Sequence, residues 1–474
     1  MKPTFLFYDY ETFGTNPSLD RPAQFAAIRT DMDLNPLGEP EVIYCYPAND
    51  YLPQPEAVLI TGITPQITYS HGVNEAEFAQ RIHRMFCVPN TCVVGYNNIR
   101  FDDEISRYLF YRNFYDPYAW SWENQNSRWD LLDVTRACYA LRPNGIKWPK
   151  NDDGFPIFRL ERITEENRIS HQRAHDALAD VYATIDLARI IKATQPKLYN
   201  FCYTHRQKHK LRNLIETNTK KILVYISSVF GAQRGNATWV TPLAWHPYNR
   251  NALITCDLGK DITSLINLNN KDAVNMHLQT YDDVFDKNTP FLPLQLIHTN
   301  KCPVIAPANT LCKKNAQRIG ADIPFYLDNF VRLKKYPKIS ENVVLLYQKK
   351  EKSCLSEDVD TKMYDGFFND ADRHIMHTIH HTPIENLINL NLISYDKRIK
   401  KLLFRFRARN FPNSLSASEK KDWLEHRRHT LHPVRIQEYI KKIHILYDIH
   451  RNHDEKKNLL QSLLDYTKKI TSSL

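Results

Sequence analysis

The sequence predicts three domains: an α/β domain over residues 1–192, a mainly β domain over 196–348 and an all-α domain over 352–474. A chain of 474 residues has room for about three domains of roughly 150 residues each. Strand-like and helical segments alternate in the first region, strand-like runs between turn residues fill the second, and helical periodicity governs the third.

The first region alternates short apolar runs with helical stretches. Thr4–Tyr8 and Cys92–Gly95 have the length and composition of strands, and Ala174–Lys192 has the spacing of a long helix. Strands interleaved with helices indicate helices packed on a sheet. The polar, basic passage Thr204–Arg212 lies near the expected boundary with the second domain.

The second region contains short apolar runs bounded by turn residues, which is typical of a mainly β domain. The predicted strands are Ile222–Val229, Thr238–Ala244, Ala252–Leu258 and Leu294–His298.

The third region is helical because apolar residues recur at i, i+3, i+4 and i+7. Ile399, Leu402, Leu403 and Phe406 make one such stripe. The segment 396–474 also holds a surplus of ten basic residues, equal to the net charge of the whole chain. A neutral body joined to a basic segment favours a protein that binds a polyanion, although a solvated helical surface explains the same charges.

Composition excludes several classes of protein. Glycine is scarce, and neither the dinucleotide-binding motif G-x-G-x-x-G nor the P-loop motif occurs. The nine cysteines are never spaced C-x-x-C, which predicts reduced thiols and no cysteine-rich zinc site. No apolar run approaches the ~18 residues of a transmembrane helix. We therefore expect a cytoplasmic protein that does not bind membranes.

Asp9 and Glu11 close the first predicted strand with one residue between them. Residues i and i+2 of a strand point to the same face of the sheet. Two carboxylates on one face can share divalent cations, which prefer oxygen ligands. Taken alone, the pattern is equally explained by two solvated acids at the end of a strand.

Two later segments carry further candidate residues. Asp102 follows the second predicted strand and opens a helix, where an acid in the first turn is also favoured by the helix dipole. His175 and Asp180 lie at the start of the long helix. Five residues span about 140° of a regular helix, so these two side chains converge only if His175 precedes the regular winding.

Together, D-x-E on a first strand, a later Asp after N-x-x-F and a closing H-x-x-x-x-D resemble the DEDDh exonuclease superfamily, defined by four acidic residues and a histidine. Longer segments are similar to the bacterial exonuclease I family: Phe5–Gly14, Asp20–Thr30, Gly95–Asp103, Tyr111–Trp122, Pro242–Asn249 and Arg407–Pro412. The resemblance extends over nearly the whole chain.

The resemblance implies a ribonuclease H-like fold for the first domain, an SH3-like fold for the second and a helical C-terminal domain. It also implies a 3′→5′ exonuclease that degrades single-stranded DNA to nucleoside 5′-monophosphates in DNA repair and recombination. The expected metal ligands for two Mg²⁺ ions, for which Mn²⁺ could substitute, are Asp9, Glu11, Asp102 and Asp180. His175 would be the general base, and Glu11 and Arg159 would contact the substrate.

The chemistry suits these residue types. Phosphodiester hydrolysis requires neutralisation of charge on the attacking and leaving oxygens, which two cations can supply. An imidazole with a pKa near 6.5 is mostly neutral at pH 7–8 and can accept a proton from water.

Aromatic side chains interleaved with cations predict the DNA contacts, because single-strand binders stack bases on aromatic rings in basic grooves. The expected contacts are Arg107, Tyr118, Trp122, Arg136, Tyr364 and Phe368, with burial in the core as the alternative for the rings. The resemblance further implies that the protein binds the acidic C-terminal tail of the single-stranded-DNA-binding protein. Enclosure of a strand by three domains favours a monomer.

Two other functions use the same residues. An exoribonuclease or a proofreading nuclease would share the catalytic set, but neither explains the two further domains. A catalytically inactive DNA-binding scaffold would have no need to keep all five residues of the set.

Overall fold

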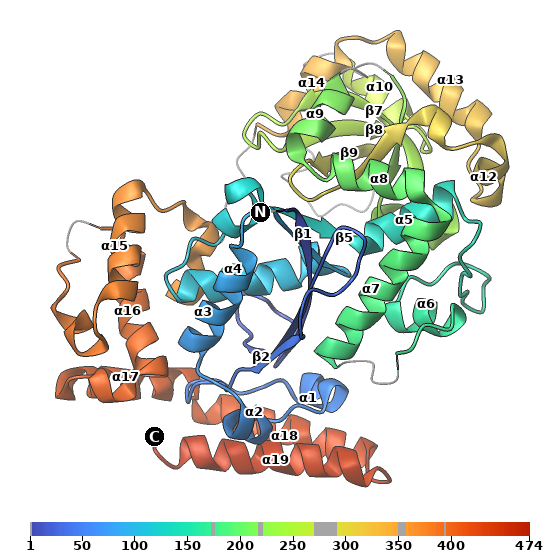
Figure 1. Cartoon of the computed structure of the whole chain (residues 1–474). Helices are drawn as coiled ribbons and strands as arrows, with labels where there is room; N and C mark the ends of the chain where they lie inside the picture. Colours follow the sequence, from blue (N-terminus) through green and yellow to red (C-terminus); the bar gives the residue numbers. More distant parts are fainter. Residues whose placement is uncertain (1, 172–175, 217–220, 270–291, 349–356, 393–394) are drawn as a thin grey trace. The chain divides into compact units, whose positions relative to one another are not determined.

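The computed structural model describes residues 2–171, 176–216, 221–269, 292–348, 357–392 and 395–474. The chain divides into two compact units (Figure 1). Unit 1 comprises residues 1–127, 171–185 and 354–474, and unit 2 comprises residues 128–170 and 186–353. Within the described ranges, every helix is too short or too polar to cross a membrane.

Unit 1 is built on a sheet whose central strand carries the first candidate residues. Its strands run in the order β3-β2-β1-β4. They are β1 (Thr4–Thr12), β2 (Pro22–Thr30), β3 (Glu41–Tyr44) and β4 (Thr91–Gly95). β1 pairs antiparallel with β2 and parallel with β4, so it is hydrogen-bonded along both edges. Both predicted strands of this region are confirmed, and β1 continues through Asp9 and Glu11.

Helices from the first part of the chain cover this sheet. They are α1 (Pro55–Thr61), α2 (Pro65–His71), α3 (Glu75–Phe86) and α4 (Asp102–Arg112). Figure 1 shows α3 and α4 on the same side of the sheet. Their apolar faces join the strands in one core that includes Tyr8, Phe25, Phe78, Phe86, Leu109 and Phe110. This packing fixes α4, and with it the acid at its first residue.

The C-terminal helices belong to the same unit because they bury their apolar faces against it. They are α15 (Asp370–His381), α16 (Lys397–Asn410), α17 (Ala417–Thr430), α18 (Pro433–Ile449) and α19 (Asp454–Thr471). The predicted apolar stripe of α16 is buried, in a core shared with Tyr108 and Tyr111 of α4. Leu460 and Leu463 of α19 pack in a second core with Phe13 and Val58.

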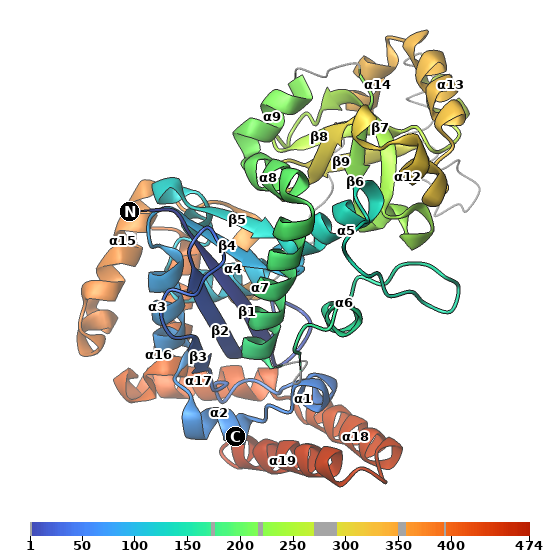
Figure 2. The same ribbon diagram turned by 45° about the vertical axis from the view of Figure 1, so that its right-hand side comes forward.

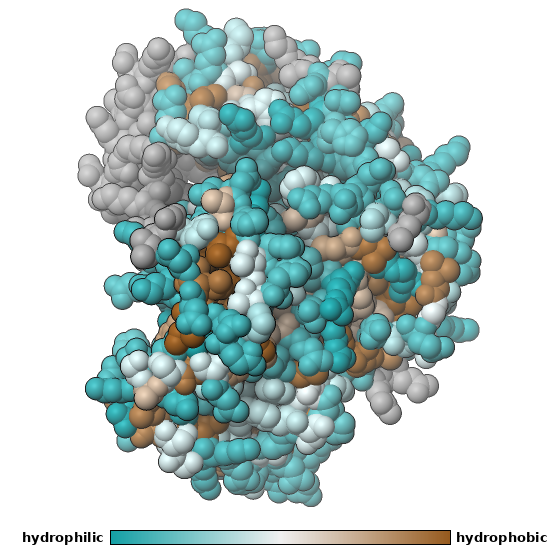
Figure 3. All heavy atoms as spheres, turned by 60° about the vertical axis from the view of Figure 1, so that its left-hand side comes forward, coloured by the Kyte–Doolittle hydropathy of each residue, from teal (hydrophilic) through white to brown (hydrophobic). Residues whose placement is uncertain are grey.

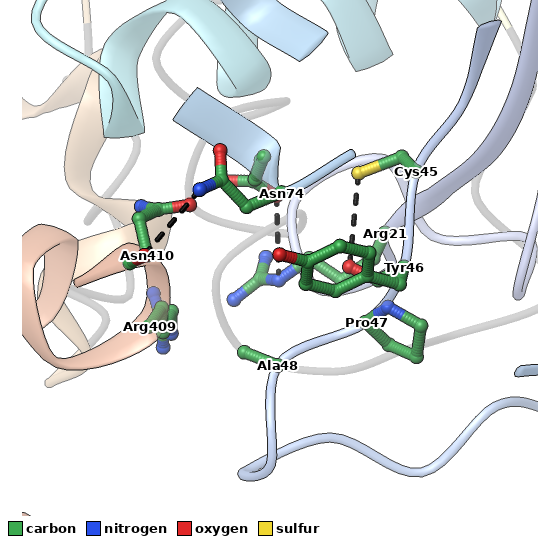
Figure 4. Close-up of a pocket in the computed structure, with 9 residues that line it drawn as sticks. Arg21, Cys45, Tyr46, Pro47, Ala48, Asn74, Arg409 and Asn410 are labelled. Atoms are coloured by element: carbon green, nitrogen blue, oxygen red, sulfur yellow. Dashed lines mark hydrogen bonds and ion pairs between the residues drawn. The ribbon is translucent and has the colours of Figure 1, made fainter. Parts of the chain in front are cut away.

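The arginines of α16 neutralise carboxylates inside unit 1. Arg405 and Arg409 both pair with the buried Asp360, at 3.1 and 2.7 Å, and Arg409 also pairs with Asp50 at 2.8 Å. Figure 4 shows Arg21 and Arg409 at a small pocket beside this network, where Asn74 Nδ2 donates to the Asn410 carbonyl oxygen. This part of the basic surplus therefore stabilises the fold instead of presenting free charge to a polyanion.

Unit 2 contains an antiparallel sheet with strands in the order β10-β6-β7-β8-β9 (Figure 2). They are β6 (Leu223–Ile226), β7 (Ala237–Trp245), β8 (Ala252–Asp257), β9 (Leu294–His298) and β10 (Val304–Pro307). The four predicted strands are confirmed, and β10 was not predicted. Val240, Leu253 and Ile297 form the core of the sheet with Leu211 and Ile215 of a covering helix.

The helices of unit 2 are α5 (Leu131–Leu141), α6 (Leu160–Glu166), α8 (Pro196–His205), α9 (Lys208–Glu216), α10 (Thr263–Ile266), α12 (Lys313–Arg318), α13 (Ile323–Lys334) and α14 (Ile339–Leu346). β5 (Ser127–Asp130) and α7 (Ala177–Thr194) begin in unit 1 and end in unit 2. α5 belongs to unit 2 because it contacts β6 and β10, and because Asn315 Nδ2 donates to the Leu141 carbonyl oxygen at 2.9 Å.

Asp360 is the carboxylate on which the ion pairs of α16 depend. Burial opposes its ionisation, but Arg409, Arg21 and Arg405 hold the pKa of Asp360 well below its usual range. We expect Asp360→Asn to lower the free energy of unfolding of unit 1 by about 3–5 kcal/mol, because it removes the buried carboxylate that Arg21, Arg405 and Arg409 share and leaves an excess of buried positive charge. Urea denaturation followed by circular dichroism measures the change.

Glu77→Gln is the matched control, because Glu77 pairs with Arg81 at an exposed position of α3. An exposed pair contributes at most about 1 kcal/mol. Equal effects of the two substitutions would show that Asp360 does not hold the network together.

Candidate active site

β1 places Asp9 and Glu11 on the same face of the sheet of unit 1. Their backbones pair with Ala26 and Gln24 of β2, and the register shifts between Glu11 and Thr12. Glu11 is buried, with 8% of its surface exposed. The D-x-E pattern is thus part of a central strand and is not a solvated strand end.

Asp180, in the first turn of α7, completes a cluster with these two acids. Carboxylate oxygens of Asp9, Glu11 and Asp180 all lie within 4.8 Å of one another. A hydrogen bond ties the start of α7 to β2: the Ala177 N–H donates to Gln24 Oε1 at 3.2 Å. Gln24 is the β2 residue that pairs with Glu11, so the same residue lies next to both elements of the cluster. The strand register and the helix start therefore act together to place the three acids.

Asp102, the first residue of α4, joins them through the backbone of β1. The Tyr10 N–H, between the two acids of β1, donates to Asp102 Oδ1 at 3.2 Å. The next residue, Asp103, accepts from the Tyr8 hydroxyl at 2.5 Å and from Asn98 Nδ2 at 3.1 Å. We call Asp9, Glu11, Asp102 and Asp180 the acidic cluster.

The acids of this cluster strongly oppose one another's ionisation. Burial, and then the charges of the other three acids, raises the pKa of Asp9 well above its ordinary value. Burial, together with neighbouring carboxylates that include Asp176, raises the pKa of Glu11 to about 9. A bound cation would remove this repulsion, so the donor set suits a hard divalent ion that prefers carboxylate oxygens.

The predicted general base, His175, lies outside the described residues. A second histidine, His171, does contact the cluster: its Nε2 lies 2.5 Å from Asp180 Oδ1, and its side chain is 5% exposed. Sequence reasoning missed this residue. The only available signal was a second histidine four positions before His175.

Arg159 and Arg136, two of the predicted substrate contacts, belong to unit 2. Arg159 is exposed and directly precedes α6. Arg136 pairs with Asp133 at 2.6 Å and lies 5.9 Å from the centre of the Phe158 ring. Their contacts with substrate stay predictions.

Arg107, Tyr118 and Tyr364 are brought together by unit 1. Arg107 pairs with Glu104 at 2.6 Å, donates to the Tyr364 hydroxyl at 3.2 Å and lies 5.3 Å from the Tyr118 ring centre. The Tyr364 hydroxyl donates to Glu104, and 57% of the Tyr364 surface is exposed. These residues form a surface cluster that presents aromatic rings beside a neutralised cation.

The remaining aromatic candidates differ in exposure. Trp122 is 63% exposed, whereas the half-buried Phe368 stacks on Tyr111 with ring centres 5.9 Å apart. Its neighbour Phe367, which was not singled out, is 80% exposed and packs edge-to-face with Tyr118, with ring centres 5.5 Å apart. On the face shown in Figure 3, hydrophobic side chains form brown patches on a mostly hydrophilic surface.

Family models match the chain in three consecutive segments. The Exonuclease model matches residues 6–188, the Exonuclease I SH3-like domain model matches 206–349, and the Exonuclease I C-terminal domain model matches 357–470. The predicted order of an exonuclease domain, an SH3-like domain and a helical C-terminal domain is therefore confirmed.

Relatives match the chain from end to end. Exodeoxyribonuclease I of Escherichia coli (strain K12) is 54% identical over 467 residues, which is 98% of each chain. Exodeoxyribonuclease I of Haemophilus influenzae is 47% identical over 468 residues, again 98% of each chain.

Solved structures of E. coli exonuclease I have the same fold. The complex with a dA16 oligonucleotide matches with a TM-score of 0.95 at 54% identity, covering 99% of this chain and 100% of that chain. The zinc-bound complex with single-stranded DNA has a TM-score of 0.93, and the SSB/exonuclease I structure with an inhibitor has 0.91, both at 53% identity and the same coverage. With this identity over nearly its whole length, the chain belongs to the exonuclease I family.

Proposed function

We propose that the protein degrades single-stranded DNA from the 3′ end, releases nucleoside 5′-monophosphates and serves DNA repair and recombination. The observation that carries the proposal is the acidic cluster. Three of its acids place ligand oxygens within 4.8 Å, and the fourth hydrogen-bonds the strand between Asp9 and Glu11. The E. coli relative that was solved with single-stranded DNA supports the substrate.

Mg²⁺ is the proposed ion, with Mn²⁺ as a substitute, and Asp9, Glu11, Asp102 and Asp180 are the proposed ligands of two ions. The donor set fits, because carboxylate oxygens are the ligands that Mg²⁺ prefers. When bound, the ions neutralise charge on the attacking and leaving oxygens of the phosphodiester. The zinc-bound relative supports a divalent metal at an exonuclease I site.

The side chains of this protein perform the remaining tasks. His175 accepts the proton of the attacking water, because a neutral imidazole is available near pH 7. Glu11 contacts the 3′-terminal nucleotide as well as metal. Arg159 holds the phosphate near the scissile end, which suits a guanidinium group on the exposed surface of unit 2.

The exposed rings of unit 1 are the proposed stacking surface for DNA bases. Tyr364, Tyr118 and Trp122 supply rings, and Arg107 orients the first two. Phe368 is half-buried and stacks on Tyr111 beside these rings. In unit 2, Arg136 would contact the backbone of the strand.

The remaining assignments follow from the family. The three domains 1–192, 196–348 and 352–474 enclose the strand within one monomer, and the enzyme acts in the cytoplasm, where bacterial DNA lies. The acidic C-terminal tail of the single-stranded-DNA-binding protein is the proposed docking partner. The SSB/exonuclease I structure supports this partner.

His175→Ala should lower kcat on single-stranded DNA about 10²–10⁴-fold while Mg²⁺ and DNA still bind, because only the proton acceptor is lost. Asp9→Asn should also abolish metal binding. Release of mononucleotides from 3′- and 5′-labelled oligomers, beside duplex and RNA substrates, measures both effects. His374→Ala, on the exposed face of α15, is the control. DNA binding without cleavage by the wild type would indicate a scaffold, and cleavage of RNA would indicate a broader nuclease.

Mg²⁺ binding should release protons at pH 7. The metal-free Glu11 carboxyl, with a pKa of about 9, is protonated at that pH, and a cation stabilises its ionised form. Metal affinity should therefore rise between pH 6 and pH 9. Calorimetry in buffers with different ionisation enthalpies counts the protons, and Glu11→Gln should release fewer. Affinity independent of pH would contradict the shared burial of these acids.

Tyr364→Ala should weaken binding of single-stranded DNA about 5–150-fold, which corresponds to the roughly 1–3 kcal/mol per stacked base. Tyr364→Phe keeps the ring and removes only the hydroxyl contacts with Arg107 and Glu104, so its affinity should stay close to that of the wild type. Fluorescence anisotropy measures the affinity. Tyr248→Ala, at an exposed position of unit 2, is the control. Equal losses in the Ala and Phe variants would assign the effect to the hydroxyl group.

A further inference from the structure

The buried His171 side chain contacts Asp180 of the acidic cluster and is distinct from the proposed general base, His175. Its Nε2 lies 2.5 Å from Asp180 Oδ1, which is a hydrogen bond from an imidazole N–H to a carboxylate. Only 5% of the His171 side chain and 17% of the Asp180 side chain are exposed. The contact therefore lies inside unit 1 and is shielded from competing water.

The backbone of Asp180 is already fixed without this contact. The Asp180 N–H donates to the Asp176 carbonyl oxygen at 3.0 Å, and the Asp176 side chain accepts from the Leu178 N–H at 3.1 Å at the helix start. Gln24 holds the Ala177 N–H. These bonds set where α7 begins, but they leave the rotation of the Asp180 carboxylate about its side-chain bonds undetermined.

The bond from His171 supplies the missing restraint. It engages one lone pair of Asp180 Oδ1 and limits the rotation of the carboxylate, whose other lone pairs can bind a cation. Carboxylates that bind metals are commonly oriented by such a neighbouring donor, and removal of the donor typically costs 10–100-fold in metal affinity or activity.

We propose that His171 is a positioning residue that orients the Asp180 carboxylate for a divalent cation, a role separate from that of His175. The inference rests on the proposed function in one respect: Asp180 is taken as a metal ligand. It requires no proton transfer by His171, because the bond alone restrains the carboxylate.

The first test measures metal binding without DNA or catalysis. His171→Phe retains an aromatic ring of similar size and removes the donor, and it should weaken Mn²⁺ binding about 10–100-fold in a titration followed by electron paramagnetic resonance. His171→Gln restores an N–H donor and should recover part of the affinity. Circular dichroism and the melting temperature verify that both variants fold. His71→Phe, on the exposed end of α2, is the matched control.

The second test separates positioning from proton transfer. In His171→Phe, the Mg²⁺ concentration for half-maximal cleavage should rise by the same factor, and saturating Mg²⁺ should restore kcat. His175→Ala should stay impaired at every Mg²⁺ concentration, because metal cannot replace a proton acceptor.

Three outcomes would overturn the proposal. Unchanged Mn²⁺ affinity in His171→Phe would mean that the bond does not orient Asp180. Tighter binding would mean that His171 competes with the cation for Oδ1. A loss of kcat that saturating Mg²⁺ does not restore would assign His171 a direct role in the reaction. If the wild type cleaves no DNA, the proposed nuclease function fails, whereas the Mn²⁺ titration still decides the role of His171.

Discussion

The structure depends on holding like charges together in a buried place. Four carboxylates converge at β1, and burial together with their mutual repulsion raises the pKa values of Asp9 and Glu11. A site of this kind would spread apart or take up protons unless the surrounding elements were rigid. The rigidity comes from three sources: a central strand paired along both edges, a helix that begins at Asp102, and a helix tied to β2 through Gln24. The same repulsion that strains the metal-free site is the source of its affinity for divalent cations.

The C-terminal helices contribute to this rigidity although their residues lie far from the acids in sequence. α4 is held on one side by the core around Phe110 and on the other by Tyr108 and Tyr111, which pack with α16. The ion pairs of Arg409 with Asp50 and Asp360 tie α16 to the chain segments around these two acids. The helical domain, which contributes no acid to the cluster, is thus part of the unit that positions Asp102. This arrangement explains why the compact units cross the domain boundaries expected from the sequence.

Strands and helices with a regular apolar spacing could be predicted from the sequence of this protein. Contacts between side chains that are distant in the chain could not. β1, β4 and the apolar stripe of α16 follow local rules of alternation and spacing, so their prediction succeeded. β10 was missed because four residues ending in proline give little strand signal. The basic surplus of residues 396–474 was explained by a polyanion-binding segment or by a solvated helical surface, and neither interpretation anticipated that Arg405 and Arg409 pair with Asp50 and Asp360, which are distant in the chain. His171 carries no local signal either: its bond to Asp180 joins side chains nine positions apart. The acids of the cluster were found by resemblance, and the spacing alone left each one explicable as a surface residue.

The ion pair between Arg107 and Glu104 affects how the enzyme would select single strands over duplex DNA. A cation paired with Glu104 has little charge left for a phosphate, so its main effect is to hold the rings of Tyr118 and Tyr364 in place. With Phe367 and Trp122, these rings give unit 1 an exposed aromatic surface. Stacking on such a surface requires an unpaired base with a free face, which a duplex does not offer, whereas phosphate charge is present in both forms of DNA. On the proposed stacking surface, selectivity for single strands would follow from the rings more than from charge, because the cation of Arg107 is already paired with Glu104.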